Sequence, residues 1–115
     1  MKGLIRYLEA SGFDVIGGEP FCAHRYEPES YFEFRDTEEE QPEVLVWCLN
    51  ELTRLYPDRW SLCPWNVGDG RFAITVDDVF KSKFCDERDL HISGKTMTAC
   101  AVSALASLPV QESRG

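Results

Sequence analysis

Four side chains in this sequence have the chemistry of zinc ligands, and they form two close pairs, Cys22-x-His24 and Cys85-x5-His91. Zinc is held by thiolate and imidazole groups in a tetrahedron, and ligands that are close in sequence are easier to bring together. Neither spacing matches a familiar zinc knuckle, and the sequence has no C-x2-C pair. We therefore expect no metal and no cofactor, and a zinc- or thiol-dependent enzyme stays as the third functional hypothesis.

Other catalytic patterns are incomplete. Gly94-Lys95-Thr96 resembles the end of a phosphate-binding P-loop, but that pattern needs a glycine five positions earlier, where Asp89 stands. Cys85 has two acids directly after it, which oppose the thiolate that a nucleophilic cysteine needs. The many carboxylates are expected to be solvated, whereas a general acid needs an apolar pocket. The sequence predicts no catalytic residue and no enzyme.

The most distinctive feature is a block of negative charge between Glu27 and Glu43. These seventeen residues hold eight acids against one base, Arg35, so the block carries −7 of the formal net charge of −8. A patch this localised repels nucleic acid and anionic membranes and attracts basic protein surfaces. The predicted partner-binding residues are the acids of the block and two aromatic anchors: Glu27, Glu29, Tyr31, Glu33, Asp36, Glu38, Glu39, Glu40, Glu43 and Trp47.

Part of this acidic block has a simpler explanation. Thr37 and Glu40 have the spacing of a capping box, and acids are favourable at the start of the helix that follows. Capping and solubility would then explain residues 38–43 without any partner. They do not explain the acids from Glu27 to Asp36, which lie on and around an aromatic strand.

Length and composition predict one domain over residues 1–109, followed by a flexible tail over 110–115. The isoelectric point near 4.7 argues against direct binding of nucleic acid. The first residues lack the apolar run of a signal peptide, and no stretch is apolar enough to span a membrane. Five widely spaced cysteines favour reduced thiols over a disulfide scaffold. We therefore expect a soluble, cytoplasmic protein.

The elements that must position these residues form an α+β pattern. Apolar residues at helical spacing predict helices at about 2–11, 39–56 and 96–108. Alternation predicts a hairpin at about 60–76, a strand at about 31–35 with Phe32 and Phe34 facing inward, and a brief strand at 13–16. Residues 19–30 contain two prolines and are expected to be mostly loop, and residues 77–93 to hold part of a further strand. The prediction is a small layered domain in which a short antiparallel sheet, made of the hairpin and the 31–35 strand, is packed by the helices.

The segment from 42 to 109 contains PEVLVWCLNEL, a hairpin that begins at Trp60, and a closing helix with the polar approach Gly94-Lys95-Thr96. In these features it resembles the phage ABA sandwich domain, in which an alanine-rich final helix packs on the sheet. The resemblance implies phage origin and a non-catalytic accessory role. It implies no functional residues.

Two functional hypotheses follow beside the enzyme. The first is a phage-type protein that binds a basic protein surface and inhibits a host-defence complex of CRISPR type, by occupying a site otherwise used by nucleic acid. The second is an accessory or structural domain that forms a homodimer through its helices. Neither binds nucleic acid or membranes directly.

Overall fold

The computed structural model describes residues 2–37, 39–65, 68, 70–80 and 88–108. The elements follow one another as α1 (Lys2–Ala10), β1 (Asp14–Ile16), β2 (Phe21–Tyr26), β3 (Glu29–Phe34), α2 (Pro42–Leu55), β4 (Trp60–Trp65), β5 (Arg71–Phe80), β6 (Arg88–Gly94) and α3 (Met97–Ser107). Three helices and two antiparallel sheets confirm the predicted α+β class. The expected tail at 110–115 lies outside the described residues.

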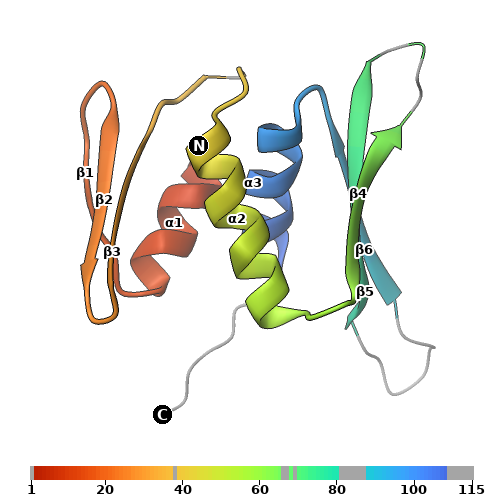
Figure 1. Cartoon of the computed structure of the whole chain (residues 1–115), viewed down its shortest axis with the longest axis horizontal. Helices are drawn as coiled ribbons and strands as arrows, with labels where there is room; N and C mark the ends of the chain where they lie inside the picture. The colour runs from red at the N-terminus through yellow and green to blue at the C-terminus, as the bar shows by residue number, and fades with distance from the viewer. Residues whose placement is uncertain (1, 38, 66–67, 69, 81–87, 109–115) are drawn as a thin grey trace.

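The chain builds three layers, with the helices between the two sheets (Figure 1). The first sheet has the order β1-β2-β3 and packs on α1 and α2, whereas the second has the order β4-β5-β6 and packs on α3. The buried apolar side chains of both halves form one continuous cluster. Each sheet therefore keeps one face on the core and turns the other away from the helices.

The first sheet corrects two sequence-based expectations. Residues 21–26 form strand β2, although 19–30 were expected to be mostly loop. The 29–34 strand pairs with β2, in register from Phe21↔Phe34 to Tyr26↔Glu29, and not with the hairpin at 60–76. The physical reason is local: a two-residue turn joins β2 to β3, so the two strands pair with the least loop-closure entropy.

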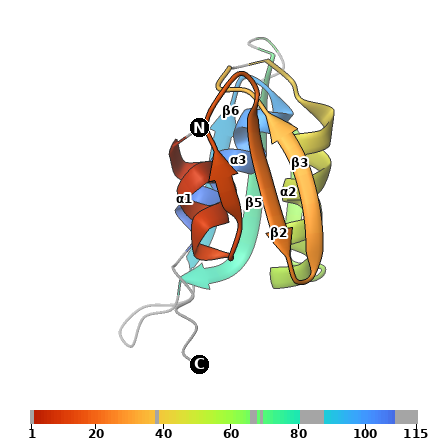
Figure 2. The same cartoon turned by 90° about the vertical axis from the view of Figure 1, so that its left-hand side faces the viewer.

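Aromatic packing joins this first sheet to the helices. Phe32 and Phe34 are buried, as their alternation predicts. Trp47 of α2 stacks on Phe32 with ring centroids 5.0 Å apart and meets Phe13 edge-on at 5.6 Å. Figure 2 shows β2 and β3 lying in front of α2, which is how Trp47 reaches the inner face of this sheet.

The capping box expected at the start of α2 is not formed. The helix begins at Pro42, with Gln41 at its N-cap making no side-chain capping bond. The side chain of Gln41 instead bonds the backbone of Arg35, accepting from its N–H at 2.7 Å and donating to its carbonyl at 2.9 Å. The hydroxyl of Thr37 accepts from the amide of Glu39 at 3.0 Å.

The second sheet and its helix follow the sequence pattern closely. Ile74 and Val76 of β5 are fully buried, and β6 supplies the further strand expected within 77–93. Pro64 lies in β4, which is an edge strand, where a missing amide donor is tolerated. Helix α3 is buried over most of its surface because it contacts α1, α2 and the sheet together. Its small side chains permit this close approach.

Candidate binding face

The outer face of the first sheet gathers aromatic and acidic side chains. Its register places Asp14, His24 and Tyr31 in one row across the three strands and Ile16, Cys22 and Glu33 in another, with Tyr26 beside Glu29. These residues alternate along the strands with the buried Ala23 and Phe32, so they point away from the helices. We define the acidic aromatic face by these eight outward side chains: Asp14, Ile16, Cys22, His24, Tyr26, Glu29, Tyr31 and Glu33.

This face exposes large hydrophobic side chains to solvent. The described residues leave five large hydrophobic side chains exposed, and three of them lie here: Ile16 at 65%, Tyr26 at 75% and Tyr31 at 57%. Large aromatic side chains are the residues that most often anchor protein interfaces. An exposed patch of this kind, rimmed by charge, is typical of an interaction surface.

Short contacts hold the side chains of the face in place. The Tyr31 hydroxyl donates to a Glu33 carboxylate oxygen at 2.7 Å and lies 3.6 Å from the Cys22 sulfur. The bond to Glu33 and the contact with Cys22 raise the pKa of Tyr31 above its ordinary value. The His24 ring meets Tyr26 edge-on at 4.3 Å, and its Nε2 is 3.8 Å from Glu29. These contacts hold the rings of Tyr31, His24 and Tyr26 in fixed orientations.

The remaining predicted acids lie beyond the two ends of strand β3. A shallow depression of about 530 Å³ is lined by Glu33, Glu39, Glu40 and Glu43, at the junction of β3 and α2. Glu27 is exposed in the β2–β3 turn and Asp36 is exposed after β3. Glu38 lies outside the described residues. The described acids of the block thus lie on the outer face of the first sheet and beyond the two ends of β3.

Glu40 has a structural role that the local sequence did not predict. One of its carboxylate oxygens accepts from the amide and hydroxyl of Thr98, at 2.8 and 2.7 Å, and the other accepts from the amide of Met97 at 2.8 Å. Glu40 therefore caps α3 and not α2. Burial raises the pKa of Glu40, but the bonds from Thr98 and Met97 outweigh it, and the net pKa is lowered.

Trp47 is placed differently from Tyr31, the other predicted aromatic anchor. It is half-buried and its ring is packed among Tyr7, Phe13 and Phe32, on the inner side of the first sheet. Tyr31, by contrast, stands on the outer face as expected. The structure therefore separates these two residues onto opposite faces of the sheet.

Sequence reasoning did not predict as binding residues the β1 and β2 contributors to the face: Asp14, Ile16, Cys22, His24 and Tyr26. The signal was present in Phe21–Tyr26, where an inward Ala23 separates Cys22 from His24 and the run is rich in aromatic residues. Pro20 and Pro28 bracket this run, and their presence favoured a loop. The alternation continues across the turn into β3, which is the pattern of a hairpin.

The two Cys/His pairs are not brought together. Cys22 and His24 lie on the outer face of the first sheet, whereas His91 lies on the outer face of the second, where its ring contacts Trp65 at 4.8 Å. The helix layer separates these two faces (Figure 1), and Cys85 lies outside the described residues. Within the described part of the chain, no group of three or more His, Cys, Asp or Glu side chains could hold a metal ion.

Comparison with models of protein families, with curated proteins and with solved structures gives no match. The resemblance to the phage ABA sandwich domain therefore stays a prediction. Among the described helices, none has the length and apolar character needed to cross a membrane.

Proposed function

We propose that this protein acts by binding a partner protein through the acidic aromatic face, and that the partner surface is basic. The observation that supports this most strongly is the presence of Tyr26 and Tyr31 on the same exposed face as Glu29 and Glu33. The function is non-enzymatic, and it needs no cofactor.

Arginine is the residue that best complements such a face. A guanidinium stacks on an aromatic ring and at the same time bonds a carboxylate through a planar fork of donors. Tyr31 and Glu33 are already bonded side by side, and Tyr26 lies opposite Glu29 in the next strand. Each ring thus has a carboxylate beside it. Each arginine of such a surface could therefore bind one ring together with its neighbouring carboxylate.

We extend this proposal to the origin of the basic surface. Surfaces rich in arginine are the usual footprint of nucleic-acid-binding proteins. A compact protein that presents fixed carboxylates to such a surface would compete with nucleic acid for it. This competition is the mechanism of the first functional hypothesis, in which a phage-type protein inhibits a host-defence complex.

The homodimer hypothesis is less well supported. A dimer built on the helices needs an apolar helix face that the fold leaves free, but the helices lie between two sheets. Val46 is the one large hydrophobic side chain that the described helical residues leave exposed. A single exposed valine offers too little apolar area for a stable interface.

The proposal is tested by reversing charge on the face and at a matched distant site. Glu29→Lys with Glu33→Lys changes the face by four charges, and Glu9→Lys with Asp77→Lys changes the net charge equally from α1 and β5. Both pairs are exposed. The probe is a labelled arginine-rich peptide, and the readout is its dissociation constant between low and physiological salt.

We expect the face variant to weaken binding about tenfold or more at low salt, and the distant variant to weaken it severalfold less. Tyr26→Ala with Tyr31→Ala should weaken binding without changing its salt dependence, because ring stacking is lost while charge is retained. Equal loss in both charge variants would show that the peptide senses only net charge, and the proposal would then be wrong. Partners captured from a lysate would next be assayed for displacement of bound nucleic acid.

A further inference from the structure

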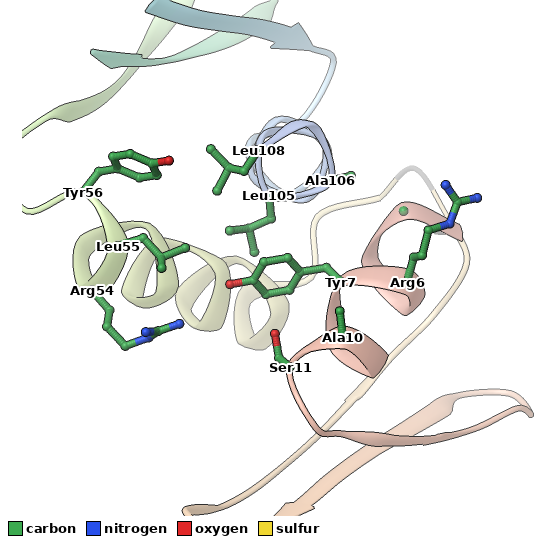
Figure 3. Close-up of a pocket in the computed structure, with 11 residues that line it drawn as sticks. Arg6, Tyr7, Ala10, Ser11, Arg54, Leu55, Tyr56, Leu105, Ala106 and Leu108 are labelled. Carbon is green, nitrogen blue, oxygen red and sulfur yellow. The ribbon is translucent and has the colours of Figure 1, made fainter. Parts of the chain in front are cut away.

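A cavity of about 320 Å³ opens between the three helices. Its size is at the lower end of the range of about 300–1,000 Å³ that is typical of small-molecule sites. Figure 3 shows it between one side of α1, the end of α2 and the last turns of α3. It is separate from the acidic aromatic face, since no residue of that face lines it.

Most of the cavity wall is apolar. Leu55, Leu105 and Leu108 point into the space between the helices, and the rings of Tyr7 and Tyr56 close two of its sides (Figure 3). Leu105 is buried and Leu108 is half-buried. An occupant must therefore present an apolar body to these side chains.

One end of the cavity carries a fixed polar network. The buried carboxylate of Glu51 accepts from the Tyr7 hydroxyl at 2.5 Å and from Arg54 through a fork, at 2.8 Å to Nε and 3.0 Å to Nη2. A guanidinium has five N–H donors, and this fork uses two of them. Arg54 is held in place by Glu51 and still has donors to offer a ligand. The side chain of Ser11 lies close by (Figure 3).

The charge of the cavity lining opposes that of the protein. The residues that line it include two arginines, Arg6 and Arg54, and no acid, in a chain of formal charge −8. Arg6 is exposed on the rim, on the opposite side of the cavity from Arg54 (Figure 3). Arg54 is paired with the carboxylate of Glu51, so the uncompensated positive charge at the cavity is that of Arg6. This charge and the spare donors of Arg54 favour an anion, and the apolar walls favour one whose charge is confined to a single end.

We propose that this cavity binds a small amphiphilic monoanion: one carboxylate on a short alkyl or aryl body. The carboxylate accepts from the remaining donors of Arg54, and the body lies among Leu55, Leu105 and Leu108. Arg6 adds positive charge on the opposite side of the opening. A nucleotide is a poor fit because its polar surface would meet apolar walls. A cationic amphiphile is disfavoured by the two arginines. This site does not depend on the binding function proposed above.

The test uses octanoate as the probe and octanol as its uncharged match, with the full chain. Isothermal titration measures affinity, and backbone amide shifts in NMR spectra locate the site. Ala10→Trp is the blocking variant, because Ala10 is exposed on the cavity rim and the added ring can fill the space without entering the core. Arg6→Gln tests the charge, and Arg35→Gln is its matched control, as Arg35 is exposed after β3.

We expect saturable octanoate binding at least about tenfold tighter than octanol binding. Ala10→Trp should abolish it, and Arg6→Gln should weaken it by about two- to fivefold while Arg35→Gln leaves it unchanged. The amide shifts in the unmodified protein should centre on Ala10, Ser11 and Leu105, which tests the site even if the tryptophan variant fails to fold. Equal affinity for octanol, no saturable binding, or shifts centred on either sheet would overturn the proposal.

Discussion

Glu40 belongs to the acidic block by sequence but to helix α3 by contact. Its carboxylate takes the first two free amides of that helix, together with the Thr98 hydroxyl. These amides have no partner within a helix, so an anion placed there is favoured by both hydrogen bonding and the helix dipole. One acid of the block therefore has a role in stability and needs no partner to explain it. The residues that it bonds are 57 and 58 positions away in the sequence.

The contribution of Glu40 can be measured directly. Glu40→Ala should lower the free energy of unfolding by about 1–2 kcal/mol, as does loss of a helix cap. Glu39→Ala is the matched control, because Glu39 is adjacent and exposed but does not cap α3. Denaturant unfolding of both variants gives the comparison. Equal, small losses in the two variants would mean that the Glu40 bonds do not stabilise α3.

The pH dependence of this contribution has a definite sign. The pKa of Glu40 is lower in the folded protein than its ordinary value of 4.5. The stabilisation is therefore fully present above pH 4.5 and is lost as the pH falls through the lower, folded-state pKa. The stability difference between the natural protein and Glu40→Ala should accordingly shrink on acidification below pH 4.5.

At the residue scale, local contacts could be predicted from the sequence and long-range contacts could not. Phe32 and Phe34 could be predicted as buried because alternation along one strand is a local signal. The partner of Glu40 could not, because capping rules consider only the next few residues of the chain. Thr37 and Glu40 satisfied such a rule, and Gln41 took the N-cap position instead. A long-range contact displaced a local preference.

Helices α1 and α3 pack closely together where Gly3 faces Ala106. A Cβ added at Gly3 would lie 2.5 Å from the Cβ of Ala106, which is too close for two carbon atoms. Neither side chain can rotate away, so one helix would have to move. The glycine therefore sets how closely α1 packs on α3.

Gly3→Ala should destabilise the protein by about 1–2 kcal/mol, although alanine favours helix more than glycine does. The overpacking outweighs the gain in helix propensity. Ala106→Gly in the same chain should restore most of the loss, because it removes the opposing methyl group. Thermal unfolding of the two single variants and the double variant completes the cycle. Additive losses would show that the two residues do not share a contact.

Elements were predictable from sequence to different degrees. Helices α1, α2 and α3 and the β4–β5 hairpin appear where they were predicted, since each has a strong periodic pattern and a proline or glycine beside it, although β5 runs on to Phe80, past the predicted end of the hairpin at 76. Strand β2 was not predicted, because its inward positions include the small Ala23 and the charged Arg25. These two residues break the alternation of large apolar and polar side chains. Periodicity detects a strand only when the buried positions are large and apolar.

At the scale of the whole molecule, the division into two sheets was not predictable from local pattern. Alternation shows which side of a strand is buried but not which strand lies beside it. The structure assigns β3 to β2 and closes the helices between two sheets. The acidic aromatic face follows from this arrangement, because it exists only if β1, β2 and β3 form a sheet of their own.

This arrangement also predicts the assembly state. We expect a monomer of 13.1 kDa in light scattering at physiological salt, because both faces of the helix layer are covered and the exposed face carries like charges. Raising the salt concentration should not change this mass. A stable dimer would contradict this prediction and support the homodimer hypothesis. The acidic aromatic face could then be part of the dimer interface.

The hydrogen bonds from Met97 and Thr98 to Glu40 join the two halves of the chain, and amide hydrogen exchange can detect whether they are formed. The amides of Met97 and Thr98 are protected from water only while the segment between β3 and α2 stays docked on the start of α3. Their hydrogen–deuterium exchange rates therefore report the position of a segment more than fifty residues earlier. A basic partner that draws this segment away would be seen at α3, without any contact there.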